Sequence, residues 1–406
     1  AEFGITNLLP FIKKYLPGTK IIPVVIPGNT SREQLNQLTS TINMFAHTTN
    51  ILLVASVDFS HYLPAEAAVL HDLKSIRVLL NFEEDIFENI EVDSWQSLYA
   101  ARLFAKLRES EKPINIVYNN SVDFLPYDLD STTSYFSVIF QKGSWEESNQ
   151  VETILLAGDM MLGRGLEKLM KEKSIYYPFQ NIVQLLRGVD IVFANLEGSV
   201  VENSRNFIDN EWEFSFHPNV LEGVKWSRIN LLSLANNHIT DLGRNELEET
   251  KSWLQEYQIH FISSPLLPSS ETKYHLFYGK KTVFLAFNRV LPFIDFREEI
   301  IKEVIFVSMH WGNEYELNSS SEQRELAHQI ISAGADIIVG HHPHVVQEIE
   351  LIQGKPVFYS LGNFIFDQQF LPETRESLLI GTVIERDQLS FRLFPIKKID
   401  GQPMLM

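Results

Sequence analysis

The feature that most constrains the fold is a set of apolar, strand-like runs that each end in side chains able to bind a metal ion. The runs and the polar residues after them are 154–157 with Asp159, 191–194 with Asn195 and Glu197, 229–235 with Asn236-Asn237-His238, 304–309 with His310, and 337–339 with Gly340-His341-His342-Pro-His344. In α/β proteins, the carboxyl ends of parallel strands line the ligand crevice. The pattern therefore predicts an α/β fold with these side chains gathered at one edge of a sheet.

The chemistry of these side chains suits divalent cations. Carboxylates can bridge two cations and offset their repulsion, while imidazoles bind borderline metals and amides add neutral oxygens. Each motif by itself is also typical of a turn or a helix cap, but repetition at successive strand ends favours a metal site. His238 is predicted to be a general acid. His341 is expected to be structural, because adjacent residues in an extended segment point to opposite sides. The predicted metal ligands are Asp159, Asn195, Glu197, Asn237, His310, His342 and His344.

The length and the apolar content predict a globular chain with more than one domain. The 406 residues are 45% hydrophobic, and domains average roughly 150 residues. A polar, aperiodic stretch at 143–151 predicts a linker between domains at 1–142 and 152–406. In the first domain we expect strands at 21–26, 51–56, 114–118 and 134–141, and helices near 66–80 and 94–108. In the second, Ser319 to Glu322 are predicted to cap a helix that ends at Gly334.

Charge and cysteine content exclude several classes of function. With 34 basic and 52 acidic residues, the net charge of −18 argues against binding to nucleic acid. The absence of Cys excludes disulfides and thiolate metal sites. No apolar run reaches the roughly 20 residues of a membrane span. Since the chain opens at Ala1 without Met, we expect its natural N-terminus to be missing, and both the cell envelope and the cytoplasm stay open as compartments.

Six motifs in order resemble the CapA/PgsA family of poly-γ-glutamate capsule synthesis proteins. They are GDMMLGR (158–164), DIVFANLEGSV (190–200), LANNHITDLG (234–243), HWGNEY (310–315), GADIIVGHHPHVVQ (334–347) and FYSLGNFIFDQ (358–368). The resemblance covers about 152–395 and implies a calcineurin-like metallophosphoesterase fold, which is a four-layer α/β/β/α sandwich.

The same resemblance implies a centre of two divalent ions, Mn, Fe, Zn or Mg, on the predicted ligands. His238 takes the place of the catalytic His, and Asp241 and Arg164 either complete the site, hold phosphate, or act as outer groups or caps. The first motif of phosphoesterases offers Asp-x-His, whereas this chain has Asp159-Met-Met161. Because a thioether is a poor ligand for hard ions, one metal position is expected to be weak or empty.

The N-terminal region resembles the Memo-like family, also called AmmeMemoRadiSam system protein B. The motifs are LLPFIKKYLPGTKIIPVVIPG (8–28) and VASVDFSHY (54–62), and they match the C-terminal half of that family. The resemblance implies a truncated Memo-like α/β domain related to extradiol dioxygenases. Where the family has Glu-His-Ser, this chain has Glu2-Phe3-Gly4, so the expected His ligand is absent. Asp58 and His61 remain candidate site residues, with a capping role as the alternative for Asp58.

Two functions compete. The first is a metal-dependent hydrolase of the phosphoesterase type, with a phosphoester or anionic polymer as substrate and the capsule polymer synthesis machinery as partner. The second is a non-catalytic scaffold or polymer-binding subunit of poly-γ-glutamate synthesis or export. Met161 favours the second, while Asn237-His238 and His342-x-His344 favour the first. Amide hydrolysis of a γ-glutamyl polymer by the same activated water is a third alternative.

Overall fold

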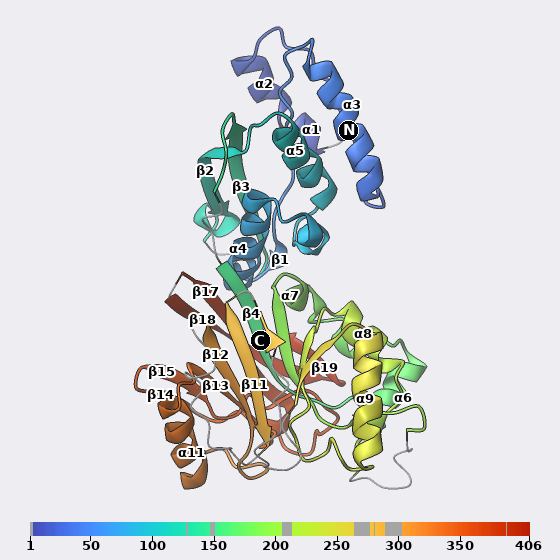
Figure 1. Ribbon diagram of the computed structural model, residues 1–406, viewed down its shortest axis with the longest axis vertical. Coiled ribbons are helices and arrows are strands. Elements are labelled where there is room, and N and C mark those ends of the chain that lie inside the picture. The colour runs from blue at the N-terminus through green and yellow to red at the C-terminus, as the bar shows by residue number, and fades with distance from the viewer. Residues whose placement is uncertain are drawn as a thin grey trace. The chain divides into compact units, whose positions relative to one another are not determined.

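The structure is a computed structural model, and it describes residues 3–126, 129–146, 151–204, 213–263, 277–279, 281–288, 303–386 and 388–406. The chain divides into two compact units, residues 1–151 and 152–406 (Figure 1). The predicted linker at 143–151 lies partly outside the described residues, and its role stays a prediction. No helix in the described parts of the chain is long and apolar enough to cross a membrane.

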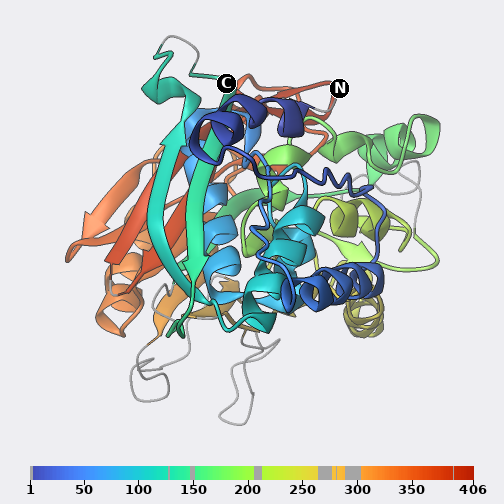
Figure 2. The same cartoon turned by 90° about the horizontal axis from the view of Figure 1, so that it is seen from above.

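Unit 1 joins a three-stranded antiparallel sheet, in the order β1-β3-β2, to a group of helices. Its long strands β2 and β3 run side by side (Figure 2). The core lies between sheet and helices and includes Leu35, Phe59, Val78 and Phe87. The elements are α1 Phe3–Thr6, α2 Leu9–Tyr15, α3 Arg32–Ala46, β1 His61–Leu63, α4 Ala65–Asn81, η1 Glu84–Asn89, α5 Trp95–Leu107, β2 Lys112–Asn120, η2 Ser121–Asp123 and β3 Thr132–Gln141.

Two of the strands expected in unit 1 are not formed. The runs at 21–26 and 51–56 have no strand assignment and no sheet partner among the described residues. Their side chains are largely exposed, with Ile22 at 84% and Leu52 at 70%. An apolar, β-branched run favours a strand only where a neighbouring strand accepts its hydrogen bonds, so propensity alone was insufficient here. The other predicted elements correspond to β2, β3, α4 and α5.

Unit 2 is built from two sheets and surrounding helices. Its elements are β4 Val151–Met160, α6 Arg164–Glu172, η3 Tyr177–Phe179, α7 Val183–Arg187, β5 Ile191–Leu196, β6 Ser199–Val200, β7 Ser215–Phe216, α8 Val220–Trp226, β8 Leu231–Ser233, α9 Arg244–Glu256, β9 His260–Ile262, β10 Phe277–Tyr278, β11 Thr282–Asn288, β12 Val304–His310, α11 Ser321–Ser332, β13 Ile337–His341, β14 Ile349–Ile352, β15 Lys355–Phe358, β16 Asn363–Ile365, η4 Glu373–Arg375, β17 Glu376–Glu385, β18 Gln388–Ile399 and β19 Gln402–Leu405.

The two sheets share a mixed topology with a parallel centre. One sheet has the order β19-β18-β17-β4-β5-β8-β9, with β16 paired to β4, and the other has the order β10-β11-β12-β13-β15-β14. The neighbours β4, β5, β8 and β9 are parallel, and so are β11, β12, β13 and β15. The parallel strands therefore bring their carboxyl ends together, as the α/β prediction required.

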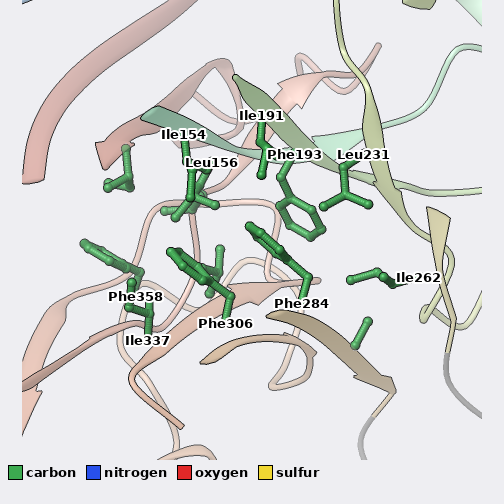
Figure 3. Packing of buried hydrophobic residues seen from close by; sticks show 14 of the residues in the cluster. Ile154, Leu156, Ile191, Phe193, Leu231, Ile262, Phe284, Phe306, Ile337 and Phe358 are labelled. Carbon is green, nitrogen blue, oxygen red and sulfur yellow. The ribbon is translucent and has the colours of Figure 1, made fainter. Parts of the chain in front are cut away.

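The main core of unit 2 lies between the two sheets (Figure 3). Ile154, Leu156 and Phe193 from one sheet face Phe284 and Phe306 from the other. The rings of Phe284 and Phe306 stack with centroids 4.6 Å apart. A second cluster joins the other face of the β11–β12–β13 sheet to α11. The result is the predicted sandwich of packed α/β layers.

The start of α11 differs by one residue from the predicted cap. Ser320, not Ser319, precedes the helix, and its side chain accepts a hydrogen bond from the backbone N–H of Gln323 at 3.2 Å. The Gln323 side chain accepts in return from the backbone N–H of Ser320 at 2.9 Å. Glutamine serves as well as glutamate at this position of a capping box, so Glu322 is not needed for it.

Candidate metal centre

The predicted ligands lie at the carboxyl ends of the parallel strands. Asp159 and His310 are near the ends of β4 and β12, and Glu197 directly follows β5. In the sheet registers, Asp159 pairs with Asn195, and His310 pairs with His341. Almost all of these side chains are buried, so their polar atoms need partners within the protein or from a bound ligand.

Two glycines allow the strand ends to approach each other. A Cβ atom at Gly158 would lie 1.9 Å from the backbone oxygen of Gly362, and one at Gly340 would lie 1.9 Å from that of Tyr359. Real Cβ atoms do not approach backbone oxygens so closely, so only glycine fits. Asp159 and His341 directly follow these glycines, and the backbone contacts therefore set where their side chains begin.

The innermost donor set consists of Asp159, Glu197 and His344, whose ligand atoms all lie within 4.8 Å of one another. His344 Nδ1 is 3.3 Å from Asp159 Oδ2, and its Nε2 is 3.8 Å from Glu197 Oε1. Both carboxylate oxygens of Glu197 are buried and have no hydrogen-bond partner among the described residues. Burial raises the pKa of Glu197 to about 8. A divalent cation would compensate this carboxylate, so the residues present fit a metal ion.

Asp159 is held from several sides. The side-chain amide of Asn195 donates to its Oδ1 at 2.9 Å, and the backbone N–H of His342 donates to its Oδ2 at 3.2 Å. His341 Nδ1 lies 3.3 Å from Oδ1, so this ring faces Asp159 and does not point away from the site as expected. Although burial acts to raise its pKa, His341 and His344 hold the pKa of Asp159 well below the ordinary value. Asp159 is therefore ionised.

His310 and Asn237 form a second group of donors. His310 Nε2 lies 2.5 Å from Asn237 Oδ1, and the ring centroid of His310 is 4.7 Å from that of His342. Burial lowers the pKa of His310 well below its ordinary value, so its imidazole is neutral, which is the form that binds metals.

Asn195 both donates to Asp159 and accepts from the Asn236 side chain at 3.2 Å. That amide therefore positions Asp159 in this arrangement.

His238 forms a pair with Asp241 at the side of the centre. Its Nδ1 lies 2.8 Å from Asp241 Oδ2, which also accepts a hydrogen bond from the backbone N–H of Phe214 at 3.0 Å. The imidazole stacks on the Phe214 ring at 4.0 Å, and its Nε2 is 3.8 Å from Glu197 Oε1. The ring is thus fixed with one nitrogen on Asp241 and the other toward the donors.

The first motif also contributes Met161 and Arg164, and each of these side chains is held by contacts of its own. Met161 is fully buried, and its sulfur accepts a hydrogen bond from the backbone N–H of Gly163 at 3.1 Å. Arg164 forms an ion pair with Asp367, with Nε 3.2 Å from Oδ2, and its guanidinium lies over Phe214 at 4.7 Å. Asp367 therefore fixes the orientation of Arg164.

Three polar residues at the centre were not singled out from the sequence. The ligand atoms of Glu314 lie within 4.8 Å of those of His342 and His344. Asn363 Oδ1 is 3.0 Å from His344 Nδ1, and Asp367 binds Arg164. All three lie inside the HWGNEY or FYSLGNFIFDQ motif, and that membership was the signal available.

The candidate residues of unit 1 lie close to one another. Asp58, His61 and Asp93 have potential ligand atoms within 4.8 Å of one another. His61 Nε2 is 3.7 Å from Asp58 Oδ2, and Asp93 Oδ1 accepts from the backbone N–H of Asp58 at 3.2 Å. Gly4 lies in α1, while Glu2 and the Phe3 side chain fall outside the described parts. A role for Asp58 and His61 stays a prediction.

Comparisons with known proteins match both units. The sequence profile of the family described as "Bacterial capsule synthesis protein PGA_cap" matches residues 153–291 and 294–368, and that of "Memo-like protein" matches residues 1–124. The chain is 30% identical over 282 residues to "PGA biosynthesis protein CapA" of Bacillus subtilis, covering 63% of this chain and 74% of that protein.

Two further relatives illustrate the two parts of the chain. "Capsule biosynthesis protein CapA" of Bacillus anthracis is 29% identical over 262 residues, covering 57% of this chain and 64% of that protein. A "MEMO1 family protein" of Caldivirga maquilingensis is 28% identical over 150 residues, covering 35% of this chain and 52% of that protein. The chain thus spans about half the length of this Memo relative. From the extent of the first profile match, the chain belongs to the family of bacterial capsule synthesis proteins.

Proposed function

We propose that unit 2 is a metal-dependent hydrolase of the phosphoesterase type that contributes to poly-γ-glutamate capsule synthesis. The observation that carries this proposal is Glu197, a fully buried carboxylate with no hydrogen bond to either oxygen among the described residues. Asp159 and His344 stand beside it as further ligands. The names of the two CapA relatives support the link to the capsule.

The proposed metal site uses the neutral and anionic donors already described. Asp159, Glu197 and His344 would hold one cation, and His310, His342 and Asn237 are the further donors. A divalent cation bound there would supply Lewis-acid polarisation of a phosphoryl oxygen and activation of water. Because His310 is neutral, it adds a lone pair without adding positive charge to the centre.

His238 is proposed to protonate the leaving group. Asp241 takes the Nδ1 side of the ring, so Nε2 carries the proton that is transferred to the departing oxygen. The stacking contact with Phe214 restricts rotation of the ring, and the contact with Asp241 fixes Nδ1.

Arg164 is proposed to offer positive charge near the phosphoryl group. Its guanidinium lies against Phe214, the same ring that stacks on His238. Asp367 holds its orientation and offsets part of its charge. Arg164 therefore suits recognition of an anionic substrate, because a guanidinium offers several N–H donors in a planar fork that matches phosphate oxygens.

The alternative is a polymer-binding or scaffold subunit, and one observation favours it. Met161 occupies the position where a phosphoesterase motif offers His, and its sulfur is engaged by the backbone N–H of Gly163. With fewer donors, one cation would stabilise the fold, and the second ion of two-metal phosphoesterases would be missing. In that case the protein would bind the polymer and leave its chemistry to a partner.

The test is turnover of phosphoesters by the purified chain after chelation and reloading with Mn²⁺. We expect hydrolysis of a phosphomonoester or a phosphodiester, loss of that hydrolysis in Asp159→Asn, and no change in Asp400→Asn, which alters an exposed carboxylate in a turn. Full Mn²⁺ occupancy with no turnover on either class of substrate would reject the hydrolase. Binding of poly-γ-glutamate by such an inactive, metal-loaded protein would then support the scaffold.

A further inference from the structure

The loop that follows β12 brings an additional carboxylate to the metal centre. Glu314 lies in this loop, and its ligand atom is within 4.8 Å of those of His342 and His344. Both imidazoles are buried, whereas Glu314 is exposed. The same His344 also belongs to the inner set with Asp159 and Glu197. Glu314 is therefore the solvent-exposed carboxylate of the centre, whereas Asp159 and Glu197 are buried.

The loop is held in this position by hydrogen bonds to the ligand segment. The backbone N–H of Tyr315 donates to the Pro343 oxygen at 2.8 Å, and Gln347 donates to the backbone oxygen of Glu316 at 2.8 Å. Tyr315 adopts a left-handed backbone with φ of 64°, as does His344 with φ of 61°. Such conformations are strained for residues other than glycine and persist only where the surroundings fix them. The position of Glu314 is thus built into the loop.

The side chain of Tyr315, the residue after Glu314, is also held at the centre. Its hydroxyl accepts a hydrogen bond from the Gln368 side chain at 3.2 Å, and its ring lies 6.0 Å from that of His344.

The charges of the centre leave room for a third carboxylate. Two divalent cations would carry four positive charges, while Asp159 and Glu197 supply two negative charges and the His and Asn donors supply none. Met161 adds neither charge nor a hard donor. Glu314 would bring the protein's share to three negative charges, which leaves one positive charge in excess to attract an anionic substrate.

We propose that Glu314 is a metal ligand and that it forms, with His342, an outer cation position beside the inner position of Asp159 and Glu197. His344 lies between the two sets. This inference rests on the proposed metal-dependent function. Glu314 would supply a donor that the first motif lacks, because Met161 stands where phosphoesterases have His. Because Glu314 is exposed and Glu197 is buried, the outer ion exchanges with solvent more readily than the inner one.

The experiment is equilibrium dialysis of the full chain against Mn²⁺, with bound metal measured by mass spectrometry. The wild type is expected to bind two ions with different affinities. Glu314→Gln should weaken the second ion at least about 10-fold, which is the lower bound found for groups that merely support a ligand. Glu316→Gln, a neighbouring exposed carboxylate in the same loop, is the matched control and should bind both ions as the wild type does.

The outcomes separate this inference from the proposed function. Two ions in Glu314→Gln with wild-type affinities would overturn the ligand role and leave the hydrolase proposal standing. No Mn²⁺ binding by the wild type would overturn both. Equal weakening in Glu314→Gln and Glu316→Gln would show a general effect of charge and would also overturn the ligand role. Since Glu314 is exposed, its replacement does not endanger folding.

Discussion

The buried carboxylate of Glu197 makes a prediction about the stability of the metal-free protein. Its pKa is raised from 4.5 to about 8 by burial, and unfolding returns it to its ordinary value. An acid whose pKa is higher in the folded state destabilises that state as the pH rises from the unfolded pKa to the folded one. Each unit in this interval costs about 1.4 kcal/mol, so the penalty at pH 7 is about 3 kcal/mol.

Glu197→Gln removes this penalty because the amide does not ionise. In the presence of a chelator, the variant should therefore be the more stable protein at pH 7 by at most about 3 kcal/mol, because the change also removes the attraction between Glu197 and His344. The difference should nearly vanish at and below about pH 4.5, where Glu197 is largely protonated in the folded protein and increasingly so in the unfolded one. With Mn²⁺ at 100 times its dissociation constant, the wild type should instead gain about 2.7 kcal/mol that a variant unable to bind the ion does not gain. Mn²⁺ should therefore cancel most or all of the stability advantage that the variant has in chelator.

The assay is urea unfolding at several pH values, with and without Mn²⁺. The transition that Mn²⁺ shifts in the wild type but not in Glu197→Gln identifies unit 2, so unfolding of unit 1 does not confuse the comparison. The reasoning would be refuted if the variant were less stable than the wild type in chelator at pH 7. A difference between the two proteins that did not change between pH 4.5 and pH 7 would equally refute it.

Three further predictions concern the site and the core. His238→Ala should leave metal content unchanged and slow turnover by roughly 10²–10⁴-fold, with a smaller defect on an aryl phosphate whose leaving group needs little protonation. His310→Ala should lower both Mn²⁺ occupancy and turnover, because it removes a neutral donor; metal analysis and kinetics check this. Phe306→Ala, in the core between the sheets, should destabilise unit 2 by about 3–5 kcal/mol in urea unfolding.

Each of these predictions has a result that would contradict it. Equal loss of metal in His238→Ala and His310→Ala would make His238 a ligand or a structural residue. Unchanged metal content in His310→Ala would remove that imidazole from the ligand set. A loss below about 1 kcal/mol in Phe306→Ala would mean that the surrounding rings close the cavity, against the close packing of the core.

The sequence predicted the parallel strands of unit 2 and the donors at their ends because both leave local marks. A buried strand needs an apolar run, and candidate donors such as Asp159 lie at the end of that run. Glu314 lies in the loop beyond its strand, so membership in the HWGNEY motif was all that set it apart from the other solvated charges among 52 acidic residues. Its nearness to His342 depends on how the loop folds over the next strand end. The side of His341 was also misjudged, because the chain after β13 does not continue as an extended strand.

The expectation for unit 1 was less accurate for a different reason. The runs at 21–26 and 51–56 have the composition of strands, yet a strand exists only with a partner, and pairing is a property of distant segments. In contrast, α4 and α5 were predicted well because the hydrogen bonds of a helix are local. The predicted cap of α11 was one residue too early, because each of three consecutive serines could have capped the helix.

The close contacts of Gly158 and Gly340 give a criterion for reading related sequences. Moving a backbone oxygen from 1.9 Å to an ordinary contact distance requires a shift of about 1.5 Å, and a misplacement of even about 1 Å can cost on the order of 100-fold in rate. A relative that keeps every donor side chain but carries a larger residue at either position would retain the signature of the centre and lose its geometry. These two glycines therefore distinguish relatives that preserve the chemistry from relatives that preserve only its motifs.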